Sequence, residues 1–370
     1  MPLRAKDQDI TRRRLANQLL LAPTLTQPAA VVQRLGAVQA QDYAGAKWAV
    51  AMRIRGNVVD AAVERAVGDG SILRTHVLRP TWHFVTPADI RWMLALTAPR
   101  VKATMAYYDR QLELDAAVFR RNNTALTRAL RDGKQLTRAE LAQVLRRARV
   151  DATGTQRLGH LMMRAELDGV VCSGARRGKQ STYALLEERV PPSATLERDA
   201  ALLELTTRYF ATRGPATEQD FAWWSGLTVA DARKGVQIAG RGLKREVIGD
   251  ATYWSDPTIR PPPNRSVSAH LLPNYDEYFI GFKDRSAIGR RLSSTEVAMG
   301  RAALLPHVVV VDGQVVGGWK RTLSQTAVMV ELSLVAGMRE AERKAVVAAA
   351  QAFGRFLELP VRLRGVGARG

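Results

Sequence analysis

Apolar residues recur at helical spacing in the first part of the chain, in short stretches that polar residues separate. The spacing predicts one helix over residues 10–21 and a second from about Pro28 to Val38. A third helix is predicted over residues 58–67, where glycines follow and mark its end. Two β-like segments, residues 72–78 and 81–86, come next. Several helices followed by a β-hairpin are the layout of a winged helix, a variant of the helix-turn-helix.

The same order recurs further along the chain. Thr137 and Glu140 have the spacing of a capping box and predict the start of a helix. A helix over residues 156–167 follows, and then a hairpin with a basic, glycine-flexed tip at residues 174–180. A third helix-helix-hairpin pattern runs from about residue 202 to 254. We therefore predict three tandem winged-helix units, although their sequences are not recognisably alike.

The last part of the chain has a different pattern, in which a proline-rich segment is followed by short strands and a helix. The segment Asp256–Arg265 is rich in proline, which excludes a helix or a central strand and predicts a linker. Strands over residues 306–311 and 314–320 meet across Asp312–Gly313, a strong hairpin signal. Another β segment at residues 328–334 and an alanine-rich helix over residues 338–356 follow.

The predicted fold class is α+β. It combines three tandem winged-helix units with a C-terminal antiparallel, barrel-like β region that carries a terminal helix. The predicted domains are residues 1–120 for the first winged helix, 121–195 for the second, 196–257 for the third and 258–370 for the C-terminal β-rich domain.

Composition is that of a globular protein. The 370 residues are 46% hydrophobic and 24% charged. The single Cys172 cannot form an internal disulfide, and the five histidines have no metal-ligand spacing, so we expect no metal and no cofactor. The polar N-terminus has no secretory signal and no run is apolar enough to span a bilayer, which predicts a cytoplasmic, nucleoid-associated protein.

Charge indicates a polyanionic partner. The chain has 55 Lys and Arg against 35 Asp and Glu, a net charge of +20 and a pI near 10.8. Residues 120–180 alone hold 14 basic and five acidic side chains. An arginine-rich genome is the alternative explanation, but it accounts for so large an excess less well. We expect a nucleic acid rather than a membrane surface, because no basic amphipathic helix with aromatic anchors stands out.

Two neutral carboxamides flank one small apolar residue in Gln39–Ala40–Gln41. Each can donate and accept at once, so a pair can hold a water molecule in a fixed orientation. Residues two apart share a side on an extended segment but not on a helix. The pair can therefore act as a unit only if the preceding helix gives way to a short strand or turn. The alternative, favoured on spacing alone, is that the glutamines only mark a helix end.

With these residues, the chain resembles the AlkZ/YcaQ-type winged-helix DNA glycosylase family, and within it the AlkZ branch. The resemblance rests on Gln39–Ala40–Gln41 and on residues 74–83, 271–278 and 282–286, and it covers nearly the whole chain. It implies that Gln39 and Gln41 are catalytic, in a monofunctional glycosylase for bulky N7-alkylated guanine. It also implies unhooking of azinomycin-type interstrand crosslinks, in DNA repair and antibiotic self-resistance.

The chemistry of that substrate suits glutamines. A guanine alkylated at N7 is cationic and leaves as a neutral base, so no general acid has to protonate it. The enzyme has to support a cationic sugar and deliver water to C1′, which positioned neutral dipoles can do. The adjacent Asp42 is interpreted as a helix N-cap in preference to an electrostatic role.

Further candidates concern DNA binding. The basic tip with Arg176, Arg177 and Lys179 is predicted to lie along a phosphate backbone. His83 is predicted to contact a phosphate or the lesion while Trp82 packs in the core. Gln314, beside the Asp-Gly turn, either probes a DNA groove or belongs to a tight turn only.

Asp276 and Glu277 leave two interpretations open. They have the look of a paired-carboxylate site, but a structural network with Lys283 and Arg285 as salt-bridge partners is favoured.

The main rival function is a winged-helix DNA-binding regulator without catalysis. Against it, the chain has no heptad dimerisation helix, and three different modules suit a single clamp better than a reader of palindromes. An RNA-binding protein is a third possibility, but no aromatic strand of the kind that stacks RNA bases is present. The predicted partner is double-stranded DNA with alkylation damage or crosslinks, bound by a monomer.

Overall fold

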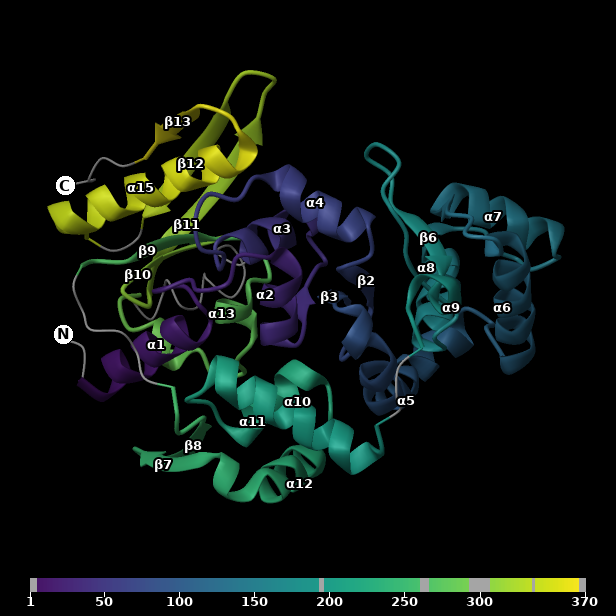
Figure 1. The fold of residues 1–370 in the computed structure, drawn as a ribbon, viewed down its shortest axis with the longest axis horizontal. Coiled ribbons are helices and arrows are strands. Elements are labelled where there is room, and N and C mark those ends of the chain that lie inside the picture. Colours follow the sequence, from purple (N-terminus) through teal and green to yellow (C-terminus); the bar gives the residue numbers. More distant parts are fainter. Residues whose placement is uncertain (1–4, 193–195, 260–265, 293–306, 335–336, 366–370) are drawn as a thin grey trace.

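The computed structural model describes residues 5–192, 196–259, 266–292, 307–334 and 337–365 (Figure 1). The first helix begins at Ala5, earlier than predicted, and it ends at Asn17, before Leu19 takes a left-handed conformation with φ 61°. After this helix, α1 (Ala5–Asn17), comes a first unit of three helices and a three-stranded sheet in the order β1-β3-β2. Its elements are α2 (Pro28–Leu35), β1 (Val38–Gln39), α3 (Tyr43–Ala51), α4 (Asp60–Gly68), β2 (Leu73–His76) and β3 (Trp82–Val85).

A second unit repeats the order helix, short strand, helix, helix, hairpin. The long helix α5 (Pro87–Gln111) leads into it, and its sheet has the equivalent order β4-β6-β5. The predicted capping box forms, with Thr137 and Glu140 each bonded to the other's backbone N–H. The elements are α6 (Ala116–Leu130), β4 (Leu136–Thr137), α7 (Arg138–Arg147), α8 (Thr155–Leu167), β5 (Val171–Ser173), β6 (Thr182–Leu185) and α9 (Leu186–Arg189).

A third unit follows the same order with its first strand reduced to a single bridge, between Ala216 and Trp254. Its elements are α10 (Arg198–Arg213), α11 (Glu218–Ser225), α12 (Val229–Ala239), β7 (Lys244–Ile248) and β8 (Ala251–Ser255). The predicted helix-helix-hairpin order is thus present in each unit, while the predicted domain boundaries stay a prediction. Part of the predicted linker, residues 260–265, lies outside the described residues.

The C-terminal region is an open five-stranded sheet in the order β13-β12-β11-β10-β9, not a closed barrel. The prediction of an antiparallel region needs one correction, because β12 and β13 are parallel. The helix α15 lies between them in sequence and provides the crossover that a parallel pair requires. The elements are β9 (Ala269–Leu272), α13 (Glu277–Ile280), β10 (Val308–Val311), β11 (Gln314–Leu323), β12 (Val328–Leu334), α15 (Glu340–Leu357) and β13 (Val361–Arg364).

The buried apolar side chains connect these parts unequally. One cluster joins α5, the hairpin β2–β3 and the third unit, and another joins the first unit to the C-terminal sheet and α15. Most of the second unit packs in a cluster of its own. Figure 1 shows this unit at one end of the molecule, with α6 and α7 outermost. The first unit therefore lies at the junction of the fold, and the second unit extends from it.

Two expectations about composition can be compared with the described part of the chain. There, no helix is both long enough and apolar enough to cross a membrane. The same residues contain no group of His, Cys, Asp and Glu side chains that could hold a metal ion.

Candidate active site

The glutamine pair lies on an extended segment. Helix α2 ends at Leu35, and Gly36 turns the chain with a φ of 79° into β1. Gln39 pairs with His83 of β3, and the Ala40 N–H donates to the Trp82 carbonyl at 2.7 Å, so the strand pairing continues past the end of β1. Gln41 lies in the bend that follows β1, two positions beyond Gln39, and its side chain bonds to the backbone of β3 at Trp82.

Gln39 is held by two charged groups. Its side chain is 7% exposed, and its Oε1 accepts a hydrogen bond from Nη2 of Arg79 at 2.7 Å. Its backbone N–H donates to Oε1 of Glu277 at 2.8 Å. A guanidinium can only donate, so the amide oxygen must face Arg79 and the NH2 group of Gln39 must point elsewhere.

Gln41 is held more loosely and is exposed. Its Oε1 accepts a hydrogen bond from the Trp82 backbone N–H at 3.3 Å, which again fixes the oxygen by the chemistry of the donor. Neither glutamine NH2 group bonds to another residue within the described part of the chain. The segment thus has two amide donors without a described partner, one on the nearly buried Gln39 and one on the exposed Gln41.

A buried ion pair supports this segment from behind. Glu277 is fully buried, and its Oε2 accepts hydrogen bonds from Nη2 of Arg213 at 2.6 Å and from Nε1 of Trp224 at 2.8 Å. Arg213 also donates to the carbonyls of Leu35 and Ala37, immediately before β1. Burying two charges costs free energy unless they pair well, and here the pair is fully hydrogen-bonded. We call Gln39, Gln41, Arg79, Arg213 and Glu277 the glutamine site.

Burial shapes the electrostatics of the site. Burial lowers the pKa of the Arg79 guanidinium, and the Glu277 carboxylate opposes that shift. Burial, and then the charge of Arg79, lower the pKa of His83 well below its usual range. His83 is therefore neutral at physiological pH.

The structure contradicts both predictions for the first hairpin, because His83 is the buried side chain and Trp82 is the one that is partly exposed. His83 is fully buried, faces the same side of the sheet as Gln39, and bonds through Nδ1 to the Thr81 carbonyl at 2.9 Å. That burial leaves it no surface for a phosphate. Trp82 is partly exposed instead, with the Arg74 guanidinium 4.2 Å from its ring.

The interpretation of Asp276 and Glu277 as structural agrees with their contacts, but the predicted partners were wrong. Asp276 pairs with Arg53 through two hydrogen bonds of 2.9 Å, and both side chains are fully buried. Glu277 pairs with Arg213. Lys283 instead donates its backbone N–H to Asp220, and Arg285 donates to the Phe279 carbonyl. A buried guanidinium on each carboxylate leaves neither of them open to a substrate.

Asp42 caps a helix, as predicted. Its side chain accepts a hydrogen bond from the Gly45 N–H at 3.0 Å at the start of α3. It also lies 3.3 Å from Nη2 of Arg321 on β11, which ties the motif to the C-terminal sheet.

The basic tip of the second unit reaches toward the first unit. Arg176 lies 4.6 Å from the Tyr43 ring centre and 3.7 Å from Glu64. Arg177 is exposed but bonds to Glu140 at 2.8 Å. Lys179 is exposed and has no ion pair with any described residue. The tip therefore offers DNA one unpaired charge and two that are already engaged.

Gln314 does not reach the surface. It is 1% exposed, its Nε2 donates to the Ala287 carbonyl, and its Oε1 accepts from the Arg290 N–H. The predicted groove contact is wrong for this side chain, and the Asp312–Gly313 turn is a tight turn bonded to Ser268.

A small cleft lies where the first two units meet. It has a volume of about 20 Å³ and is lined in part by Tyr43, Arg74, Trp82, Glu166 and Tyr183. Pockets that enclose a small ligand usually have roughly 300–1,000 Å³, so this cleft has no room for an extruded base.

The residues that sequence reasoning missed are Arg79 and Arg213, together with the contact of Glu277 to Gln39. Arg79 follows Leu78, whose φ is 65°, and a Cβ at Gly226 would collide with the Leu78 carbonyl. The loop is therefore fixed by tight packing against the end of α11. A positive φ at a leucine and a distant glycine give no recognisable sequence signal.

Comparison with known proteins gives concordant results. A family model described as DNA glycosylase AlkZ-like matches residues 32–356. The chain is 29% identical over 322 residues to an interstrand DNA cross-link repair glycosylase of Streptomyces sahachiroi, covering 80% of this chain and 83% of that protein. It is also similar to the solved structure of Streptomyces sahachiroi DNA glycosylase AlkZ, with a TM-score of 0.78 and 25% identity over 98% of this chain and 100% of that one.

Proposed function

The chain belongs to the AlkZ-like DNA glycosylase family and is a DNA glycosylase, and from that premise we propose that it hydrolyses the N-glycosidic bond of bulky N7-alkylguanine. We include guanines joined in an interstrand crosslink, because the Streptomyces relative is named an interstrand DNA cross-link repair glycosylase. Repair of such damage, and self-resistance to the agent that causes it, follow as the biological role. Membership of an enzyme family argues against the rival function of a regulator without catalysis.

The observation that carries the proposal is the pair of anchored amides. Both carbonyl oxygens are fixed by donors of the protein, and neither NH2 group bonds to another described residue. In the described chain, the site brings no free carboxylate or charged imidazole to these groups. Such a site can position and polarise groups but is a poor general base, so it suits a bond that is already activated.

An N7-alkylated guanine provides that activation. Its positive charge weakens the glycosidic bond, and the base departs neutral without a proton from the enzyme. Gln41, exposed and free of charged partners, is suited to orient water at C1′ and to support the developing sugar cation through its oxygen. The Arg79 charge on the Gln39 oxygen makes that amide a better donor and a worse support for a cation. We therefore assign water positioning to Gln39 and both tasks to Gln41.

Recognition without base flipping suits a crosslinked base. A base that is tied to the opposite strand cannot leave the duplex without carrying that strand along. Enclosed pockets serve enzymes that flip their target, whereas the cleft beside Trp82 holds about 20 Å³. Recognition of the adduct at the duplex surface is therefore the proposed mode.

Single-turnover release of N7-methylguanine from a duplex tests the proposal. Gln39→Ala and Gln41→Ala should each slow release by up to about 100-fold, the typical cost of one positioned donor. DNA affinity should change little. The double variant should lose less than the product of the single losses, because the two side chains act on one water. Gln41→Asp should keep partial activity, since a carboxylate can also orient water and support a cation.

The matched control is Gln33→Ala, an exposed glutamine of α2 that lies six residues before Gln39. It should behave as wild type. Wild-type release by a folded Gln39→Ala, Gln41→Ala protein would refute the assignment of catalysis to this pair. Comparable rates on uracil DNA would refute the preference for a cationic base.

A further inference from the structure

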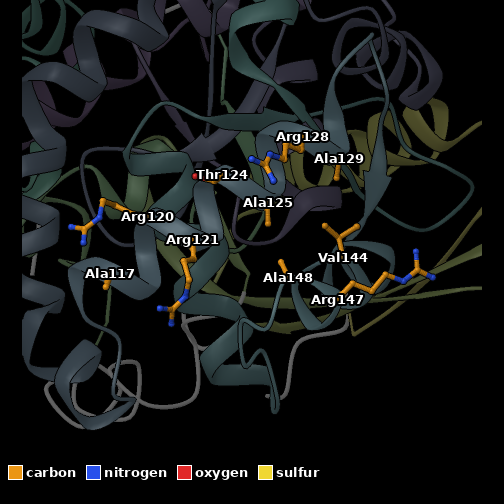
Figure 2. Close-up of a pocket in the computed structure, with 10 residues that line it drawn as sticks. All are labelled: Ala117, Arg120, Arg121, Thr124, Ala125, Arg128, Ala129, Val144, Arg147 and Ala148. Carbon is orange, nitrogen blue, oxygen red and sulfur yellow. The ribbon is translucent and has the colours of Figure 1, made fainter.

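The second unit carries a surface that the glutamine site does not use. A groove of about 970 Å³ runs between α6 and the end of α7. Four of its ten lining residues are arginines, and the others are small or neutral. We call Arg120, Arg121, Arg128 and Arg147 the arginine groove. Figure 2 shows these arginines standing around the short side chains of Ala125 and Ala148.

The four guanidiniums are exposed, and none of them is in an ion pair with a described residue. Helix α6 contains no acidic residue, and its cap Asp115 bonds to the Val118 N–H. That bond, and then the charges of Arg121 and Arg120, help to lower the pKa of Asp115, but neither arginine forms an ion pair with it. Four like charges beside one carboxylate still repel one another, and a bound anion relieves that repulsion.

From this arrangement we propose that the arginine groove binds the sugar-phosphate backbone of duplex DNA outside the lesion. The guanidinium fork matches phosphate oxygens. Arg120 and Arg128 are eight residues apart on one helix, which is about 12 Å along its axis. One DNA strand places a phosphate about every 3.4 Å along the duplex axis, so the groove spans roughly three to four of them.

The lining also argues against other occupants. No aromatic ring lines the groove, so it lacks the stacking platform that single strands use. It also lacks the large apolar anchors that dominate protein interfaces. Small side chains such as Ala117, Ala125 and Ala129 allow a backbone to approach closely. With base stacking and apolar anchors excluded, contact with the phosphates of a DNA backbone is the kind of binding that agrees with this lining.

The position of the groove agrees with an extended footprint. α6 and α7 lie outermost in the second unit, and the basic tip projects between α7 and the first unit (Figure 1). A duplex that contacts the tip would have to extend along the second unit to reach the groove. The inference rests on the proposed function only in taking DNA as the partner, because it concerns binding and not excision.

The test compares two variants with equal charge. The groove variant is Arg120→Gln, Arg121→Gln, Arg128→Gln, Arg147→Gln, and the control replaces Arg241, Arg245, Arg355 and Arg362 by Gln. The control arginines are also exposed and free of ion pairs within the described chain, but lie on other elements. Fluorescence anisotropy measures binding to undamaged duplexes of a short and a long length at several salt concentrations. Melting temperature verifies folding.

Loss of four phosphate contacts should reduce the slope of log K against log salt by about 3.6. Over a fourfold rise in salt, wild-type binding to the long duplex should therefore fall about 150-fold further than binding of the groove variant. The short duplex should show little difference. An unchanged slope in the groove variant would overturn the proposal and leave an acidic protein as the candidate occupant. An equal loss in the control would also overturn it, as a general effect of charge.

The rate of base excision distinguishes a failure of the groove from a failure of the proposed function. At saturating enzyme, the groove variant should release N7-methylguanine at the wild-type rate. A wild-type protein that releases no base would refute the proposed substrate, while the dependence of binding on duplex length and salt would still decide the groove.

Discussion

The arginines of the glutamine site and those of the arginine groove differ in burial and in pairing. In the glutamine site Arg213 is fully buried and paired with Glu277, and Arg79 donates a hydrogen bond to the amide oxygen of Gln39. In the groove four arginines are exposed and none is paired with a described residue. Composition counts all of them equally in the net charge of +20. What distinguishes them is burial and the presence of a partner, so only the second kind is available to DNA.

The largest expected difference between the two regions is in stability. Glu277→Gln keeps the shape of the side chain but leaves Arg213 as a buried charge without a counter-charge. Breaking one partner of a buried pair costs about 3–5 kcal/mol of the free energy of unfolding. Arg121→Gln in the groove should stay within about 0.5 kcal/mol, as surface changes do. Urea unfolding of the three proteins measures both values.

Equal stability of the two variants would contradict this prediction. If Glu277→Gln and Arg121→Gln proved equally stable, the buried pair would contribute nothing that a neutral amide cannot replace. The double change Glu277→Gln, Arg213→Met sharpens the result. It removes the unpaired charge as well, and should recover part of the lost stability.

The second prediction concerns pH, because buried histidines titrate in the accessible range and guanidiniums do not. Burial, and then the charge of Arg53, lower the pKa of His270 to about 4. Between pH 6.5 and 4 the unfolded chain therefore binds a proton that the folded chain does not. Stability is present above pH 6.5 and falls as the pH drops, by about 1.4 kcal/mol per pH unit for this histidine.

Substitution at His270 tests that sign. His270→Asn cannot titrate, so its stability should fall less steeply than wild type between pH 6.5 and 4 when urea unfolding is repeated across that range. The groove variant should keep the wild-type slope. A His270→Asn protein with the wild-type slope would show that this imidazole is charged in the folded state.

The third prediction concerns Arg79 as a positioning residue. Arg79→Met removes the bond to the Gln39 oxygen, and a hydrogen bond to a charged group contributes about 1.5–3 kcal/mol. Since Arg79 acts through Gln39, single-turnover release should slow by about tenfold or more. The enzyme concentration for half-maximal rate should stay near wild type. Arg79→Lys retains a charged donor and should recover part of the rate.

A purely structural role for Arg79 predicts a different pattern. Melting temperature would fall with both variants, and Lys would not restore the rate. If instead Arg79→Met raised the half-maximal concentration without slowing release, Arg79 would be a DNA contact. Either pattern would remove it from the glutamine site.

Local patterns predicted the positions that depend on neighbours in sequence. The helix that ends before Gln39, the capping box at Thr137 and the hairpins of all three units depend on residues a few positions apart. The glutamines could be placed on an extended segment for that reason. Their support could not, because Glu277 lies 238 residues from Gln39 and nothing in either neighbourhood indicates the other.

Alternation in a strand left one choice open at Trp82 and His83. It required that one side chain face inward but not which one. The face with Gln39 and His83 is covered, whereas Trp82 meets the second unit through Glu166. That outcome depends on which unit packs where. The excess of charge in residues 120–180 was visible in the sequence, but its gathering into a groove depends on α6 lying beside α7.

The smallest expected effect distinguishes the unpaired Lys179 from the paired Arg177 in the basic tip of the second unit. Lys179 is exposed and unpaired among the described residues, so Lys179→Ala should reduce the salt slope of DNA binding by about 0.9, the value for one phosphate contact. Arg177 is exposed but bonded to Glu140, and that bond has to be given up before it can hold a phosphate. Arg177→Ala should therefore change the slope by less. Glu140→Gln removes the charged partner of Arg177, so the salt slope of DNA binding should be steeper for this variant than for the wild type. Anisotropy titrations on one long duplex measure all three. Equal slopes for Lys179→Ala and Arg177→Ala would mean that pairing within the protein does not withhold a charge from DNA, and the contrast between paired and unpaired basic side chains would then fail at the surface.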